Sequence, residues 1–231
     1  MYVHMNKRKI NVKLLYLIVL VIYILTLLYS FATGFFEQNW NRVGMTVVSV
    51  LCLLIIPVVF KIFRWKPVYE IYVLGTCFMY FASLIGSCLG GYSVRYFDKV
   101  VHLCSGIFAT LLAIMLFSIL KKVRQAQNKE DYHLLLVFVN AVNLAIAVIW
   151  EFYEYAMLIF FNNDAINHYT QGVHDTITDM MSACVGGLFV TMILIHRYRT
   201  QKPNFLINVP ERFYEKNIAH HRQRKMEEGN K

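Results

Sequence analysis

Six long apolar segments dominate this 231-residue chain and restrict what it can fold into. Most are close to the roughly 20 residues that an α-helix needs to cross a bilayer. Lipid offers no hydrogen-bond partner to a bare backbone, so such segments are expected to cross as helices. We therefore predict an all-α integral membrane bundle of six transmembrane helices. The predicted spans are residues 14–36, 43–60, 71–94, 100–120, 134–161 and 175–195.

Composition agrees with this class of protein. The chain is 58% hydrophobic and only 16% charged, whereas soluble domains carry about 25% charged residues. The first apolar segment is too long for the core of a cleaved signal peptide and is predicted to be a retained helix. The five cysteines all lie inside apolar segments, which favours packing roles over a disulfide framework or a zinc site.

Basic residues alternate between the predicted loops, and this alternation predicts the orientation. Twenty of the 23 lysines and arginines lie in the N-terminus, the second and fourth connections and the C-terminal end; the others are Arg42, Arg95 and Lys99. Positive loops remain in the cytoplasm, so both termini are predicted to be cytoplasmic. Residues 1–195 would form the transmembrane domain and residues 196–231 a basic cytoplasmic tail. Membrane lipids, not nucleic acid, are the expected partner of that charge.

Three pairs of polar residues interrupt the last three apolar segments. They are Asp98 with His102, Glu151 with Glu154, and Asp175 with Asp179. The spacing of three or four residues places each pair on one helix face. With the predicted orientation, all three pairs lie near the extracytoplasmic surface. The sequence therefore predicts one polar site, built by three helices at the same depth.

Five carboxylates and one histidine at one level would repel one another unless cations or protons neutralise them. Arg95 and Lys99 are near enough to supply two charges, and a metal ion is a second source. Carboxylate and imidazole suit magnesium, manganese, zinc or iron. The predicted metal ligands are His102, Glu151, Glu154 and Asp179, and Asp98 or Asp175 is the predicted general base. Asp98 and Asp175 also begin helices, and a carboxylate at such a position can act as a helix cap without any role in chemistry.

Three motifs carry a resemblance to a known family. DKVVH at 98–102, WEFYEY at 150–155 and TQGVHDTITDM at 170–180 resemble the signatures of the YjdF-like family of bacterial inner-membrane proteins, with a looser similarity to VanZ-like proteins. The resemblance implies a six-span protein of the bacterial cytoplasmic membrane, but no reaction or substrate. The positions that it implicates are Asp98, His102, Glu151, Glu154, Thr170, Gln171, Gly172, Asp175, Thr176 and Asp179.

Three functions remain open from the sequence. The first is a metal-dependent membrane hydrolase that acts on a lipid or an envelope precursor. The second is a transporter or channel for protons or cations, because Asn140 and Asn143 extend the polar face of the fifth helix toward the cytoplasm. The third is a structural envelope protein, whose polar cluster holds the helices in register.

Overall fold

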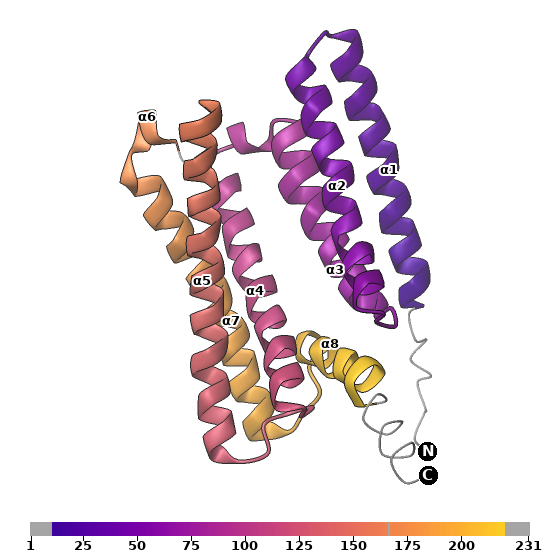
Figure 1. The fold of residues 1–231 in the computed structure, drawn as a ribbon, viewed down its shortest axis with the longest axis vertical. Helices are drawn as coiled ribbons and strands as arrows, with labels where there is room; N and C mark the ends of the chain where they lie inside the picture. Colours follow the sequence, from indigo (N-terminus) through magenta and orange to yellow (C-terminus); the bar gives the residue numbers. More distant parts are fainter. Residues whose placement is uncertain (1–10, 166, 220–231) are drawn as a thin grey trace, which may run out of the picture. The chain divides into compact units, whose positions relative to one another are not determined.

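The computed structural model of the chain describes residues 11–165 and 167–219 (Figure 1). Every regular element in these residues is a helix, and six helical segments are long and apolar enough to cross a membrane. The predicted all-α fold with six membrane-spanning helices is thus confirmed, while the cytoplasmic location of the termini stays a prediction. The six are α1 (Val12–Phe36), α2 (Trp40–Ile62), α3 (Tyr69–Met79) continued by the π-helical η1 (Tyr80–Cys88), α4 (Phe97–Lys121), α5 (Lys129–Phe161) and α7 (Val173–Thr200).

The third span ends at Cys88 and not at residue 94 as predicted. Gly90 has a φ of +81°, the left-handed conformation in which a glycine commonly terminates a helix. The short 3₁₀ turn η2 (Gly91–Ser93) follows before α4 begins. Leu89 and Gly90 also mark the boundary between two compact units, Met1–Leu89 and Gly90–Lys231.

The first unit is held together by hydroxyl groups as well as by apolar packing. Tyr23 is fully buried and donates to the Ser49 carbonyl oxygen at 3.0 Å. Ser30 and Thr46 lie 2.8 Å apart, and the Ser49 and Ser83 hydroxyls 2.6 Å apart. Side-chain hydrogen bonds of this kind join helices inside a membrane, where the hydrophobic effect between helices is weak.

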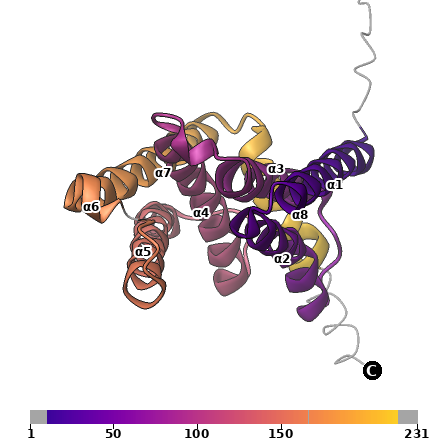
Figure 2. The ribbon, with the colours of Figure 1, turned by 90° about the horizontal axis from the view of Figure 1, so that it is seen from above.

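In the second unit, α4, α5 and α7 lie side by side in both views (Figures 1 and 2). Leu111, Val139 and Val190 bring one residue of each helix into the buried core. Toward the other end, α4 and α7 come into backbone contact. A Cβ added at Gly106 would lie 1.9 Å from the Ala183 carbonyl oxygen, and one at Gly186 would lie 2.0 Å from that of Leu103.

This crossing makes a direct prediction about stability. We expect Gly106→Ala and Gly186→Ala each to lower the free energy of unfolding by about 1–3 kcal/mol, because the backbones must separate to admit the methyl group. Gly44→Ala is the matched control, since its Cβ would meet no atom within 4 Å; alanine there is expected to stabilise α2 by about 0.5–1 kcal/mol. Melting in detergent measures all three. Equal effects at all three positions would contradict close packing of α4 on α7.

The chain continues to fold beyond the last predicted span. Helix α7 extends to Thr200, and α8 (Phe205–Tyr214) and the π-turn η3 (Glu215–Ala219) follow. The Asn204 side chain caps α8 by accepting from the Leu206 amide at 2.9 Å. Ile207 of α8 belongs to the same core as α4, α5 and α7. The start of the predicted basic tail is therefore a packed helix, while residues 220–231 lie outside the described residues.

Candidate functional site

The structure brings the predicted polar pairs together at one end of the second unit. The beginning of α4 supplies Asp98 and His102, the last third of α5 supplies Glu151 and Glu154, and the first turns of α7 supply Asp175 and Asp179. These helix ends lie at the top of α4, α5 and α7 in Figure 1. Since α4 and α7 run opposite to α5, residues far apart in sequence reach one level.

His102 lies where two groups of potential ligands meet. Asp98, His102 and Asp179 form one group, and His102, Glu151 and Glu154 form the other. Within each group, one ligand atom per residue lies within 4.8 Å of the others. The His102 Nε2 atom is 3.5 Å from Asp98 Oδ1 and 3.8 Å from Asp179 Oδ1. The imidazole itself is buried, with 6% of its surface exposed.

Lys99 neutralises one side of this cluster. Its Nζ lies 2.6 Å from Asp175 Oδ1, 2.8 Å from Asp179 Oδ1 and 3.6 Å from Asp98 Oδ2. The contact between Lys99 and Asp179 is an ion pair and not a hydrogen bond. The Asp179 Oδ1 atom is buried and has no hydrogen-bond partner in the part of the chain described. One ammonium group thus holds the beginnings of α4 and α7 together.

Asp175 is fully engaged in this arrangement. Only 1% of its surface is exposed. Besides Lys99, it accepts hydrogen bonds from Asn167 Nδ2 at 2.7 Å and from Gln171 Nε2 at 3.2 Å. Its carboxylate oxygens are therefore occupied by contacts that fix the loop entering α7, and Asp175 is not free to act as a general base.

Glu151 is in the opposite situation. It is buried, with 5% of its surface exposed, and neither carboxylate oxygen has a hydrogen-bond partner among the described residues. Thr176 lies near it but not in good hydrogen-bond geometry. Glu154 accepts one hydrogen bond from Trp150 Nε1 at 2.8 Å. Buried carboxylates are normally paired or bound to metal, so the Glu151 carboxylate is a candidate ligand for a cation.

Tyr92, in η2, lies beside the same carboxylates and outside the membrane spans. Although 41% of its surface is exposed, partial desolvation, and then the charges of Asp98, Glu154 and Asp179, raise the pKa of its phenol. The hydroxyl therefore stays protonated and is available as a hydrogen-bond donor. Its ring packs edge-on against Phe97 at 5.4 Å. Tyr92 was not predicted as a site residue, because the only sequence signal near it is its closeness to the first motif.

A family described as "Predicted membrane protein (DUF2238)" matches residues 14–201, which include all three motifs. The chain belongs to the DUF2238 family. No curated protein and no solved structure matches it. The description establishes a membrane protein and assigns no reaction, and the YjdF-like resemblance is consistent with it.

In this DUF2238 protein, the remaining residues of the third motif shape the turn into α7. Gly172 has φ +59° and ψ −139°, a conformation that is nearly restricted to glycine. The Thr170 hydroxyl donates to the Asn167 carbonyl oxygen at 3.2 Å. Asn167 was not predicted, although it orders both the turn and Asp175. Arg95, a predicted source of positive charge, lies over the Tyr96 ring at 4.6 Å.

Proposed function

We propose that this protein is a metal-dependent membrane enzyme whose divalent cation is held by His102, Glu151 and Glu154. The observation that carries the proposal is Glu151, a buried carboxylate with both oxygens unpartnered beside two further ligand groups. A divalent cation would offset the repulsion between the two glutamates. Asp179, the fourth predicted ligand, already faces Lys99 at 2.8 Å, so we assign it to the ion-pair side of the cluster.

The residue types fit magnesium, manganese, zinc or iron. Three protein ligands leave coordination positions open, as in catalytic rather than structural sites. When bound, the cation would supply Lewis-acid activation of a water or a substrate oxygen. Asp98 is the better general base of the two predicted, because 26% of its side chain is exposed and it lies 3.5 Å from His102. Tyr92 is placed to donate a hydrogen bond to the substrate.

The position of the site supports an amphiphilic substrate. It lies at the ends of three apolar helices, where a lipid or a lipid-linked envelope precursor can present a polar group while its chains stay in the bilayer. The YjdF-like resemblance and the predicted orientation support a place in the bacterial cytoplasmic membrane, with the site on the extracytoplasmic side. The class of reaction that we propose is hydrolysis.

Metal content tests the proposal first. Protein purified in detergent without chelator is expected to contain nearly one divalent ion per chain by elemental analysis. After chelation, returning Mn²⁺ or Zn²⁺ at about 100 times its Kd should restore about 2.7 kcal/mol of stability. Asp98→Asn is the matched variant, which should keep the ion and lose hydrolysis of lipid phosphoesters. A folded wild type that takes up neither metal would refute the assignment.

One observation favours the transport alternative. Asn143 is 2% exposed, and its Oδ1 has no hydrogen-bond partner within the described part of the chain. At the level of Asn143 itself, however, the α4 and α7 backbones touch, because the Ala183 carbonyl oxygen that accepts from Asn143 Nδ2 also faces Gly106. Close packing at that level favours a site closed toward the cytoplasm. Metal-independent proton flux in vesicles, abolished by Asn143→Ala, would reverse this preference.

A further inference from the structure

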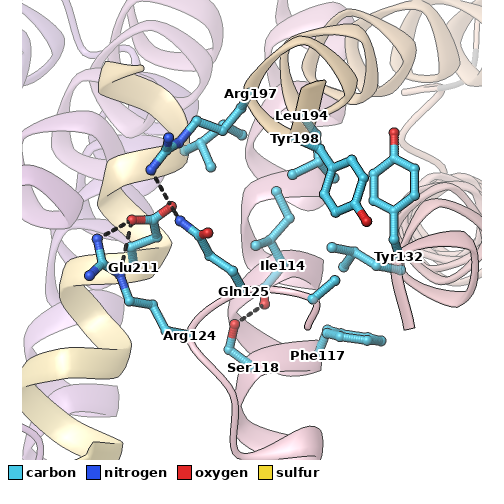
Figure 3. A pocket seen from close by; sticks show the side chains of 13 residues that line it. Ile114, Phe117, Ser118, Arg124, Gln125, Tyr132, Leu194, Arg197, Tyr198 and Glu211 are labelled. Atoms are coloured by element: carbon cyan, nitrogen blue, oxygen red, sulfur yellow. Dashed lines mark hydrogen bonds and ion pairs between the residues drawn. The ribbon is translucent and has the colours of Figure 1, made fainter. Parts of the chain in front are cut away.

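A pocket lies at the other end of α4 and α7, away from the acidic cluster. Figure 3 shows the side chains that line it. Its free interior is only about 40 Å³. Five aliphatic and aromatic side chains from all four neighbouring helices form its apolar wall. They are Ile114 and Phe117 of α4, Leu135 of α5, Leu194 of α7 and Ile207 of α8. The stacked rings of Tyr132 and Tyr198, 3.8 Å apart, line one side.

A polar hollow adjoins this apolar pocket and shares four residues with it. Arg124, Gln125, Ala126 and Arg197 line both, and Gln127 and Gln201 complete the polar part. The combined site is therefore amphipathic. Guanidinium and amide groups face one region, and hydrocarbon faces the other.

The polar region already holds one negative charge. Glu211 of α8 is 3% exposed and accepts from Arg124 Nε at 3.1 Å and Arg124 Nη2 at 2.6 Å. Gln125 donates to its other oxygen, and Arg197 Nη2 lies 3.5 Å from that oxygen. Figure 3 shows these donors converging on the carboxylate. Glu211 accordingly raises the pKa of Arg124, which lies outside the membrane spans.

Arg197 retains capacity for a further acceptor. Its Nη1 donates to the Gln201 carbonyl oxygen at 2.5 Å, but its Nε is buried without a hydrogen-bond partner in the residues that the structure describes. The guanidinium lines both parts of the site. Lys121, Lys122, Lys129, Arg199 and Lys202 lie in the neighbouring sequence and make this end of the unit positive. A buried arginine donor in such a field favours an anionic acceptor.

We propose that the polar hollow, about 460 Å³ in volume, binds the headgroup of one anionic phospholipid, with its phosphate on Arg197. The place of the hollow at the ends of membrane-spanning helices favours a lipid over a free anion. Basic pockets between transmembrane helices on the positively charged side of a membrane protein bind lipid headgroups in this manner. The proposal does not depend on the metal site.

The test uses the full chain in detergent and titrates phosphatidylglycerol, phosphatidylcholine and inorganic phosphate separately, with bound lipid read by native mass spectrometry. Phosphatidylglycerol should bind as one retained copy. Arg197→Gln is expected to weaken it on the order of fivefold, the effect of losing one basic residue that contacts an anionic headgroup. Arg199→Gln is the matched control, since Arg199 is exposed two residues away on the same helix and does not line the hollow; it should weaken binding much less than Arg197→Gln does.

A conservative variant separates lipid binding from folding. Arg197→Lys keeps the charge and its attraction to Glu211 but has no Nε–H, so it should fold and still bind phosphatidylglycerol more weakly than wild type. Wild-type binding by Arg197→Lys, or equal loss in Arg199→Gln, would overturn the assignment to Arg197. Equal binding of phosphatidylcholine would exclude recognition of an anionic headgroup. Full competition by inorganic phosphate at matched concentration would identify a free-anion site instead.

Discussion

Glu151→Gln is expected to abolish metal binding without unfolding the protein. The amide removes a charged ligand, and glutamine offers only a weak neutral oxygen to a hard cation. The bound ion per chain should fall from near one to less than about a tenth, since loss of one ligand costs far more than the 10- to 100-fold that is typical when a residue hydrogen-bonded to a ligand is changed. Elemental analysis before and after dialysis against Mn²⁺ or Zn²⁺ measures this directly.

The melting temperature of the same variant is an independent test of the metal site. In wild type without metal, Glu151 is buried beside Glu154, with no hydrogen-bond partner among residues 11–165 and 167–219. The neutral amide removes their mutual repulsion, so the metal-free variant should melt at or above the wild-type temperature, and added metal should no longer raise it. Glu130→Gln, an exposed position at the start of α5, should behave as wild type throughout. A metal-free Glu151→Gln protein that melts well below wild type would indicate a structural role for the carboxylate.

Lys99→Gln should be the most destabilising single change at the site. The ammonium group lies 2.6 Å from Asp175 and 2.8 Å from Asp179, both 1% exposed. Removing one partner from a buried ion pair typically costs about 3–5 kcal/mol, because the remaining charge is left uncompensated. We expect a loss of this size in the free energy of unfolding, measured by denaturant titration in detergent micelles.

A double-mutant cycle identifies the cause of that loss. Adding Asp179→Asn to Lys99→Gln removes one of the two uncompensated charges, so the double variant should regain part of the stability. Lys129→Gln, at an exposed position, should change the free energy by less than about 0.5 kcal/mol. Strictly additive effects of the Lys99 and Asp179 changes would show that the ion pair contributes nothing.

The two results together divide the cluster by role. Lys99, Asp175 and Asp179 form a lysine-centred network that joins α4 to α7, while His102, Glu151 and Glu154 form the candidate metal site. The structural and enzymatic hypotheses, posed as alternatives from the sequence, thus apply to different halves of one cluster. Loss of metal in Glu151→Gln with intact folding, and loss of folding in Lys99→Gln, would support this division.

Hydropathy alone was sufficient to place the six helices, because a hydrocarbon core about 30 Å thick allows few other structures for such segments. The helical repeat likewise placed each polar pair on one face, and opposite chain directions placed all three pairs at one end. The ends of the helices were predicted less accurately from the sequence. The third helix ended early at Gly90, and α8 was missed because its residues read as a basic tail.

Only the tertiary structure decided which polar groups are satisfied. Six titratable side chains at one level look alike in sequence, yet within the part of the chain that the structure describes Asp175 has three donors and Glu151 has none. The difference depends on the rotation of each helix about its axis and on the reach of Lys99 and Asn167. Contact of α4 with α7 at Gly106 and Gly186 brings those helices close enough for one lysine to bridge them, and Glu151 on α5 is left beyond its reach.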